Sequence, residues 1–167
     1  MDTVERVGHI ELRDLDDDDL DAIFEMMRDR AAVEMAAFTA ADPDDRAVFD
    51  EWMARHRAAP EVSMFVVTED GGFAGTAAVF SVEADREVTY WIARHAWGRG
   101  VATEALRVLV SREPERPLFA RVAAHNAASL AVLTKVGFTE VSRDVEFAPG
   151  VGRDVEEIVL VLVPTLE

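Results

Sequence analysis

Near the middle of the chain, two glycines separate a strand-like run from a helix-like run, at a place where backbone groups alone could bind an anion. Residues 88–92 are mostly β-branched and aromatic, which predicts a strand. Apolar residues at helical spacing in 105–110 predict a helix. Gly98 and Gly100 remove two side chains where backbone N–H groups enter the first helical turn. Since those N–H groups lack helical partners and carry the positive end of the helix dipole, the loop is suited to a diphosphate.

The same loop could also be a tight turn that binds nothing. It lacks the third glycine of a dinucleotide-binding fold and the Gly-Lys-Ser/Thr ending of a nucleoside-triphosphate loop, so neither class is supported. A second strand–loop–helix segment, residues 121–138, favours a ligand site. It carries Asn126 and Ser129 at the predicted start of a helix, and Gly137 followed by Phe138 at its end.

Together, the two segments resemble the GCN5-related N-acetyltransferases (GNAT), and among them the subgroup that acetylates the N-termini of ribosomal proteins. The family's acetyl-CoA loop, Gln/Arg-x-x-Gly-x-Gly/Ala, is similar to Trp97–Ala102, with an aromatic residue at the first position as is common in the subgroup. The subgroup pattern Tyr-Trp-Ile/Leu followed by Trp-Gly-x-Gly-x-Ala-Thr-Glu-Ala is similar to Tyr90–Ala105. Asn-x-x-Ser followed by Gly-Phe is similar to residues 126–138. The resemblance extends from Phe65 to the C-terminus.

The resemblance implies an α/β fold with a mixed, mostly antiparallel sheet, a splayed central pair of parallel strands, and helices on both faces. It also implies one domain over residues 1–167, in which residues 1–60 form helices that cover the acceptor and residues 61–167 bind acetyl-CoA.

Acetyl-CoA is the co-substrate that the resemblance implies, lying where the parallel strands separate. The backbone of Tyr90 and Ile92 would pair with the pantetheine arm, and Asn126 would reach the same arm. The loop that holds the diphosphate would comprise Trp97, Gly98, Arg99, Gly100, Val101, Ala102 and Thr103. Arg99 and Arg94 could pair with phosphates or be solvated surface groups. No metal is expected.

Transfer to an amine requires that the ammonium lose a proton, that the thioester carbonyl be polarised, and that the leaving thiolate meet a donor. The chain has no cysteine, which is consistent with direct transfer. In many GNAT members the donor is a tyrosine four residues before Gly-Phe, and that position is Leu133 here. The one tyrosine, Tyr90, is predicted on the central strand, which closes that route. Ser129, one helical turn before Leu133, matches the serine donor of the subgroup, although it could instead cap or pack the start of its helix.

Two carboxylates are candidates for the base. Glu146 lies in Glu-Phe-x-x-Gly-x-x-x-Asp and matches a subgroup glutamate on the closing hairpin. Glu87 begins the central strand and matches Glu-Ile-Gly-Tyr-Trp. Either could be an ordinary paired or exposed carboxylate, and a water could relay the proton instead.

Composition limits the function classes. The formal net charge of −16 over 167 residues disfavours binding to a nucleic-acid backbone, and the acidity serves either to attract a cationic acceptor or simply to keep the protein in solution. The absence of cysteine excludes disulfides and suits a reducing compartment. No apolar run approaches the roughly 20 residues that span a membrane, so a cytoplasmic protein without a membrane partner is predicted.

Local patterns predict the remaining elements. A first strand is predicted over Val7–Leu12, and an amphipathic helix after the acidic run 16–19. Asp42 and Pro43 suit the start of a further helix. Hairpins are predicted for residues 62–82 and 140–163, and parallel strands for 87–93 and 118–124. The residues that could line an acceptor pocket, or simply form helix core, are Met26, Met27, Met35, Phe38 and Trp52.

The sequence therefore predicts an N-acetyltransferase that moves an acetyl group from acetyl-CoA directly to a primary amine, such as a protein or peptide N-terminus. The alternatives are an enzyme for a small amine, such as an antibiotic or a polyamine-like compound, and an acyl-CoA-binding sensor without turnover. A monomer and a homodimer are equally compatible with the sequence.

Overall fold

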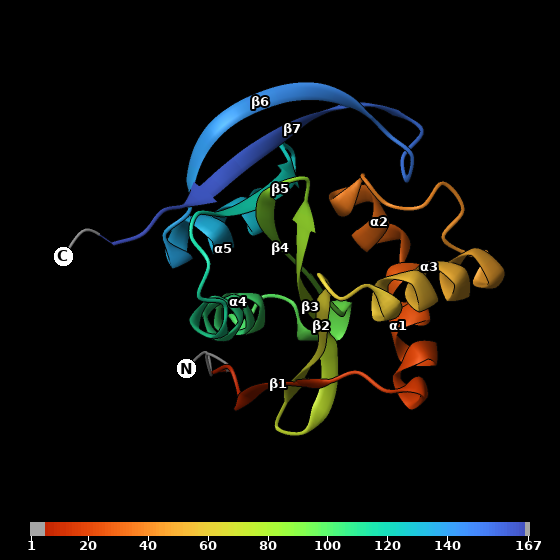
Figure 1. The fold of residues 1–167 in the computed structure, drawn as a ribbon. Coiled ribbons are helices and arrows are strands. Elements are labelled where there is room, and N and C mark those ends of the chain that lie inside the picture. The colour runs from red at the N-terminus through yellow and green to blue at the C-terminus, as the bar shows by residue number, and fades with distance from the viewer. Residues whose placement is uncertain (1–5, 166–167) are drawn as a thin grey trace, which may run out of the picture.

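A seven-stranded, mostly antiparallel sheet forms the centre of the computed structural model, which describes residues 6–165 (Figure 1). The strands lie in the order β1-β2-β3-β4-β5-β7-β6, and the predicted mixed α/β class is confirmed. The first five and last two residues of the predicted 1–167 domain lie outside the described residues. The strands are β1 (Ile10–Asp14), β2 (Ser63–Glu69), β3 (Gly72–Val82), β4 (Asp85–Ile92), β5 (Leu118–Ala123), β6 (Thr139–Ala148) and β7 (Arg153–Leu162). The helices are α1 (Leu20–Met27), α2 (Arg30–Ala36), α3 (Arg46–Ala58), α4 (Val101–Arg112) and α5 (Ala127–Val136), with short 3-10 turns at Asp17–Asp19 and Arg94–Ala96.

The predicted parallel pair is confirmed as β4 and β5, and it is paired over a short distance. Its register holds Arg86 with Leu118 and Glu87 with Phe119. Beyond these residues β4 stays paired with β3, and β5 stays paired with β7. The two strands therefore separate after Glu87, which is the splay that the sequence predicts.

The two faces of the sheet are covered by different helices, because successive side chains of a strand point to opposite faces. Val88 and Ile92 of β4 pack with Leu106 of α4 and Leu133 of α5 in the main buried cluster. Trp91 packs on the opposite face with buried side chains of α1 and α3. Within residues 6–165 no helix is long and apolar enough to cross a membrane.

The predicted start of α3 is wrong by three residues. The Asp42 carboxylate accepts a hydrogen bond from Asp44 N at 3.0 Å and so forms a turn before the helix. Asp45 is the N-cap, and its carboxylate accepts from Val48 N at 3.1 Å. Two aspartates in one loop compete for the same capping role, and the turn made by the first leaves the second to begin the helix.

The first strand also begins later than predicted, at Ile10 rather than Val7. Gly8 N donates to the Glu69 carboxylate at 2.9 Å instead of joining the ladder. A side chain therefore satisfies the backbone ahead of β1, and regular pairing starts after it.

The hairpin of β6 and β7 arches away from the rest of the sheet, and its tip reaches α2 (Figure 1). Gly150 N donates to Ala37 O at 3.0 Å, and Arg153 bonds Glu34 at 2.6 Å. Ala37 and Ala148 are both fully buried in a small cluster at this contact. These contacts attach the tip of the C-terminal hairpin to α2.

Candidate active site

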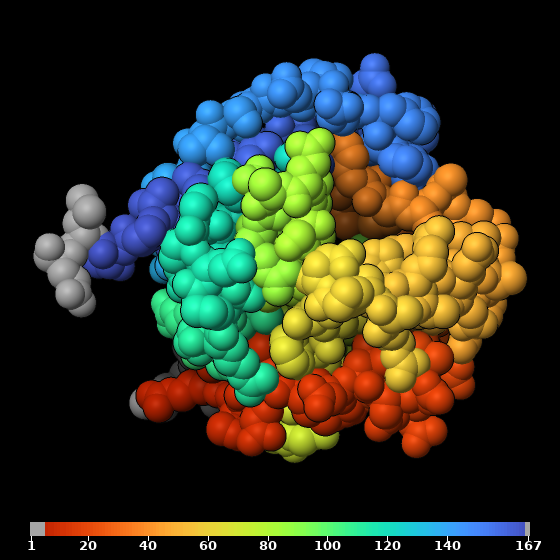
Figure 2. Space-filling view, in the orientation of Figure 1, coloured from red at the N-terminus to blue at the C-terminus, as the bar shows by residue number. Residues whose placement is uncertain are grey.

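A cavity of about 600 Å³ lies between the sheet and α1–α3, and Figure 2 shows the surface hollowed between the strands and the orange-brown and yellow segments of α2 and α3. Consecutive residues of β4, including Val88, Thr89 and Tyr90, all contribute to its wall, as does Ser129 of α5. Because Ser129 and Asn126 belong to the start of α5, the cavity reaches the gap where β4 and β5 separate. Two substrates could approach each other there from opposite faces of the sheet.

The edge of β4 that faces this gap carries free backbone groups. Ala93 N donates to Ala74 O of β3 at 2.8 Å, so the alternation of an antiparallel ladder directs the odd-numbered residues of β4 to β3. The backbone N–H and C=O groups of Tyr90 and Ile92 consequently point toward the gap. Trp97 Nε1 donates to Ile92 O at 2.7 Å, which anchors the loop after β4 on the same edge.

The glycine loop has the conformation that an anion site needs. Gly98 and Gly100 have φ of 79° and 87°, and a Cβ at either position would meet nothing within 4 Å. The requirement for glycine is therefore conformational rather than steric. Gly100 is the N-cap of α4 and provides no side-chain cap, so the first-turn N–H groups of residues 101–103 have no helical acceptor. The loop therefore has the backbone conformation and the exposed helix start on which the prediction of a diphosphate site depends.

Each of the two arginines near the loop holds a carboxylate. Arg99 Nη1 donates to Glu69 at 2.6 Å, and this guanidinium holds the pKa of Glu69 below its usual value. Arg94 Nη2 donates at 2.6 Å to Asp29, the N-cap of α2, and Arg94 Cζ lies 6.0 Å from the centre of the Trp97 ring. These contacts fix the loop against β2 and α2, and a phosphate would share the guanidinium groups with the carboxylates.

Ser129 and Tyr90 meet at the gap. Their hydroxyl oxygens are 2.6 Å apart, which joins β4 to α5. Asn126, the N-cap of α5, accepts a hydrogen bond from Ser129 N at 3.2 Å and also lines the cavity. Burial raises the pKa of Tyr90 to about 12, so its phenol stays protonated near neutral pH. Sequence reasoning missed the pair, because a strand assignment does not reveal which helix the side chain meets.

Of the two predicted base candidates, Glu87 lines the cavity and Glu146 does not. Glu87 is 4% exposed and accepts a hydrogen bond from Arg121 Nε at 3.0 Å. Arg121 Nη1 also donates to Glu157 at 3.4 Å. Glu146 is exposed on β6.

Glu157 of β7 is a cavity residue that sequence reasoning missed. Burial raises its pKa and the negative charges of Glu146 and Glu87 add to that effect, whereas Arg121 opposes it. Glu157 points to the same face of its strand as Val155 and Val159, because it lies two residues from each. This apolar spacing could have indicated that its carboxylate faces the protein interior.

Some of the residues predicted to line an acceptor pocket do so, and others do not. The cavity is lined by Met27, Phe38 and Trp52. Met26 is 7% exposed and packs in the cluster of α1 and α3, and Met35 is not among the lining residues.

Comparison with known proteins bears on this site. Residues 9–139 match the family model described as the acetyltransferase (GNAT) domain. No curated protein matches the sequence.

Solved structures resemble the fold over most of its length. RimJ of Mycobacterium smegmatis, in complex with CoA-disulfide, has a TM-score of 0.78 at 23% identity, covering 95% of this chain and 84% of that one. Spermidine N-acetyltransferase from Vibrio cholerae, in complex with CoA and spermine, has a TM-score of 0.75 at 21% identity, covering 91% and 95%. The yncA protein of Salmonella typhimurium, solved with its cofactor acetyl-CoA, has a TM-score of 0.71 at 24% identity, covering 95% of both chains. At these identities the likeness shows a common fold.

Proposed function

This chain belongs to the GNAT family of acetyltransferases, and we propose that it transfers an acetyl group directly to a primary amine that enters the cavity from the side of α1–α3. Membership confirms the predicted enzyme class, an acyl-CoA-dependent N-acetyltransferase, and acetyl-CoA as its co-substrate. One observation carries the proposal: the cavity over the sheet reaches the gap between β4 and β5, beside Ser129. A thioester presented from one face can meet an amine presented from the other.

The residues proposed for acetyl-CoA remain those predicted from the sequence. The backbone groups of Tyr90 and Ile92 that β3 leaves unpaired support pairing with the pantetheine amides, although Ile92 O already accepts one hydrogen bond from Trp97. Asn126 uses its side-chain oxygen for the helix cap, so its amide nitrogen is the group proposed to reach the same arm. The positive-φ glycines support a role in diphosphate binding for the loop of Trp97, Gly98, Arg99, Gly100, Val101, Ala102 and Thr103.

Ser129 is the proposed donor to the departing thiolate. As the nitrogen–carbon bond forms, the carbon–sulfur bond breaks and its electron pair stays on sulfur, where a hydroxyl donor stabilises the charge. Tyr90 then acts as a positioning residue. With a pKa of about 12 it keeps its proton, and we assign it as the donor of the 2.6 Å hydrogen bond to Ser129 Oγ. In that orientation the serine O–H is free to point at the sulfur.

Glu87 and Glu146 remain proposed acceptors of the ammonium proton, and Glu157 joins them on structural grounds. Glu87 and Glu157 both line the cavity and share Arg121. Glu146 does not line the cavity, so it would accept the proton through a water molecule. A protein N-terminus and a small amine are both acceptors of this chemistry.

The test is thiol release from acetyl-CoA across small amines, polyamines and peptides, with mass spectrometry of the acetylated product. We expect release above background hydrolysis for at least one amine class. Binding of CoA with no transfer to any amine would contradict the proposal and indicate an acyl-CoA sensor.

Substitutions then test the donor. Ser129→Ala should lower kcat roughly a hundredfold, with the KM for acetyl-CoA unchanged. Tyr90→Phe keeps the ring and should cost roughly tenfold in kcat, because one hydrogen bond is lost. Ser111→Ala, an exposed serine on α4, is the matched control. An unchanged kcat in Ser129→Ala would remove the donor assignment without affecting the family.

A further inference from the structure

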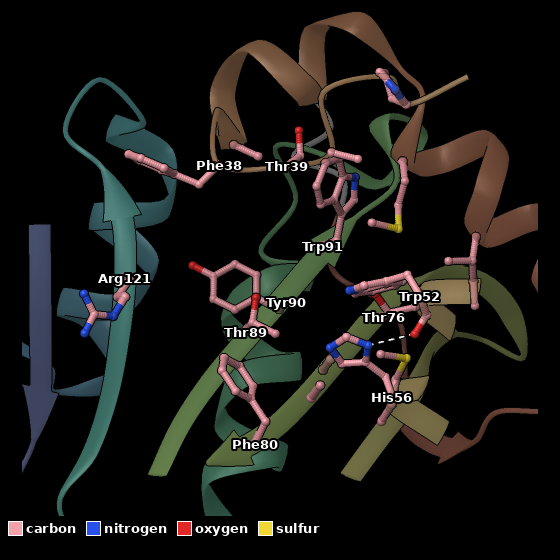
Figure 3. Close-up of a pocket in the computed structure, with 18 of the residues that line it drawn as sticks. Phe38, Thr39, Trp52, His56, Thr76, Phe80, Thr89, Tyr90, Trp91 and Arg121 are labelled. Atoms are coloured by element: carbon pink, nitrogen blue, oxygen red, sulfur yellow. Dashed lines mark hydrogen bonds between the residues drawn. The ribbon is translucent and has the colours of Figure 1, made fainter. Parts of the chain in front are cut away.

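The acceptor side of the cavity has an aromatic wall. Trp52 of α3, Phe80 of β3 and Trp91 of β4 line it, each partly buried (Figure 3). The Trp52 ring packs beside His56, which also lines the cavity: the ring centres are 4.5 Å apart, and His56 Nδ1 is 2.8 Å from the Trp52 carbonyl oxygen. An apolar surface fixed in this way is preorganised for an apolar ligand group.

Charge is concentrated next to this wall. Glu87 lies directly opposite Phe80 in the register of β3 and β4. The cluster of Glu87, Arg121 and Glu157 contains two carboxylates and one guanidinium. When both carboxyl groups are ionised its net charge is −1, which matches one ammonium group.

The spacing of side chains along β4 relates the charged cluster to the aromatic wall. Glu87, Thr89 and Trp91 share one face, and alternate side chains on a strand are about 7 Å apart. An amine at the gap near Thr89 is therefore within one such step of the carboxylates on one side and of the Trp91 indole on the other. A phenylalkyl group has about this length.

The remaining acidic lining residues do not extend the charged region. Asp42 and Asp45 are exposed on the loop before α3. Each already accepts a backbone N–H, Asp42 from Asp44 and Asp45 from Val48. The other charges of a polyamine could pair only with these exposed carboxylates, where water and salt screen the attraction.

We infer that the acceptor is a singly charged primary amine attached to an apolar, ring-sized group, with the ammonium near Thr89, where Glu87 and Glu157 attract it, and the ring against Trp52 and Trp91. This assignment rests on the proposed function and specifies its acceptor. A free arylalkylamine and an N-terminal residue with a large apolar side chain share this chemistry. Two buried polar atoms in the lining, Trp91 Nε1 and Thr39 Oγ1, have no hydrogen-bond partner among the described residues. Since neither atom has accessible surface, an acceptor in the cavity would reach them only after a shift of these side chains.

The experiment compares kcat/KM for four acceptors at saturating acetyl-CoA: phenylalaninamide, alaninamide, phenethylamine and spermidine. Phenylalaninamide and alaninamide differ only in the ring, whose burial should give phenylalaninamide an advantage of roughly tenfold to a hundredfold. Phenethylamine has the ring without the amide and should fall between the two. Spermidine should be the poorest. A peptide that begins with Phe, added to the same series, distinguishes a peptide N-terminus from a free amine as the source.

Two variants separate the ring site from the ammonium site. Trp52→Ala should lower kcat/KM for phenylalaninamide roughly tenfold and leave alaninamide unchanged, while Trp52→Phe should restore most of the preference. Glu157→Gln should lower kcat/KM for both amides by the same factor, with their ratio preserved. Phe147→Ala is the matched control, because this ring is 60% exposed on β6 and outside the lining.

The possible results distinguish the proposed ring site from the proposed acetyltransferase activity. Acetylation with alaninamide or spermidine equal to phenylalaninamide would overturn the ring site and leave the acetyltransferase proposal intact. An equal loss for both amides in Trp52→Ala and Trp52→Phe would also overturn it, since a general structural role predicts that result. No acetylation of any acceptor would overturn the proposed function itself.

Discussion

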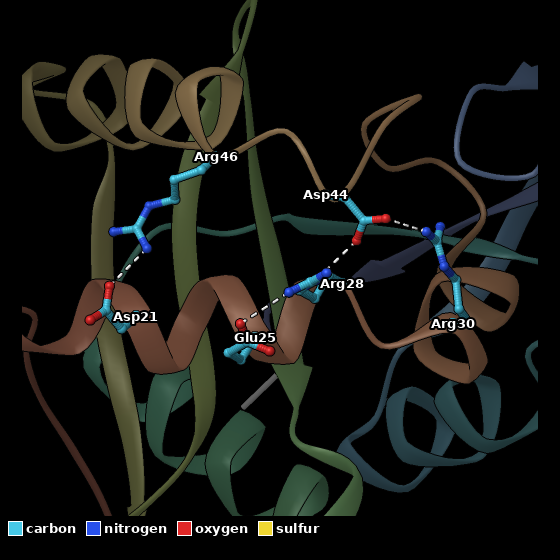
Figure 4. Close-up of polar contacts among 6 residues, drawn as sticks. All are labelled: Asp21, Glu25, Arg28, Arg30, Asp44 and Arg46. Carbon is cyan, nitrogen blue, oxygen red and sulfur yellow. Dashed lines mark hydrogen bonds and ion pairs between the residues drawn. The ribbon is translucent and has the colours of Figure 1, made fainter.

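The two faces of the sheet are stabilised by different interactions. On the face of α4 and α5, apolar side chains form one large cluster in which Leu106 and Leu118 have no exposed surface. On the face of α1–α3 the buried cluster is smaller. Ion pairs at the surface connect these helices and their loops: Arg28 with Glu25 and Asp44, Arg30 with Asp44, and Arg46 with Asp21 (Figure 4).

This difference corresponds to the two proposed substrates. Close packing transmits strain and fixes geometry, which suits the face that would position acetyl-CoA. Exposed ion pairs contribute little each and are screened by salt, so the helices over the acceptor can be substituted with less effect on the rest of the fold. Stability should therefore depend mainly on the first face and acceptor choice on the second.

The largest expected effect is in the main cluster. Leu118→Ala removes a side chain with no exposed surface and should lower the free energy of unfolding by about 2–5 kcal/mol. Val48→Ala on α3, where the side chain is 49% exposed, should change it by less than about 0.5 kcal/mol. Urea unfolding of both variants measures the contrast. Similar losses would mean that the two faces do not differ as described.

A smaller effect is expected where the N-terminal helices begin. The Asp19 carboxylate accepts two hydrogen bonds from Arg13, at 2.7 and 2.8 Å, and one from Asp16 N at 2.9 Å. Asp19→Ala should therefore cost about 1.5–3 kcal/mol at neutral pH. The neighbouring exposed Asp18 provides the control, since Asp18→Ala should be nearly neutral.

The contribution of Asp19 should also depend on pH in a defined direction. The Arg13 guanidinium lowers the pKa of Asp19 in the folded protein, whereas the unfolded chain titrates near the ordinary value of about 4. The stabilisation is complete above that ordinary value and is lost as the pH falls through the lowered folded pKa. The difference between the native protein and Asp19→Ala should shrink in acid unfolding series. A difference that stayed constant down to the lowest pH would contradict the ion pair.

The smallest effect is expected at the surface ion pairs. Asp44→Asn removes the charge shared by Arg28 and Arg30, and its effect on the unfolding midpoint should be well below that of Asp19→Ala. It should disappear in 1 M salt, where the Debye length is about 3 Å. A large, salt-independent loss would show that these pairs are as important to stability as the buried cluster.

Short-range patterns in the sequence predicted much of the fold. The glycine loop, the hairpin at residues 69–72 and the crossover between the parallel strands each depend on the properties of a few adjacent residues, and the structure contains all three. Errors in the predicted starts of elements arose where two neighbouring residues could play the same role, and where a residue distant in the sequence decided the outcome. Asp42 and Asp45 can both cap a helix, and composition does not rank them. The start of β1 depended on a side chain 61 residues away, Glu69, which binds Gly8 N.

The candidate site likewise contains features that a local motif predicts and features that depend on contacts between distant elements. The amino-acid sequence alone predicted roles for Ser129, Glu87 and the loop from Trp97 to Thr103, because each lies in a contiguous motif. The pairing of Tyr90 with Ser129, and the cluster of Glu87, Arg121 and Glu157, were decided only by the tertiary structure. These contacts join separate strands and a helix, so they depend on strand register and on the divergence of β4 from β5. Neither is encoded in a local pattern, because both result from how all seven strands pack together.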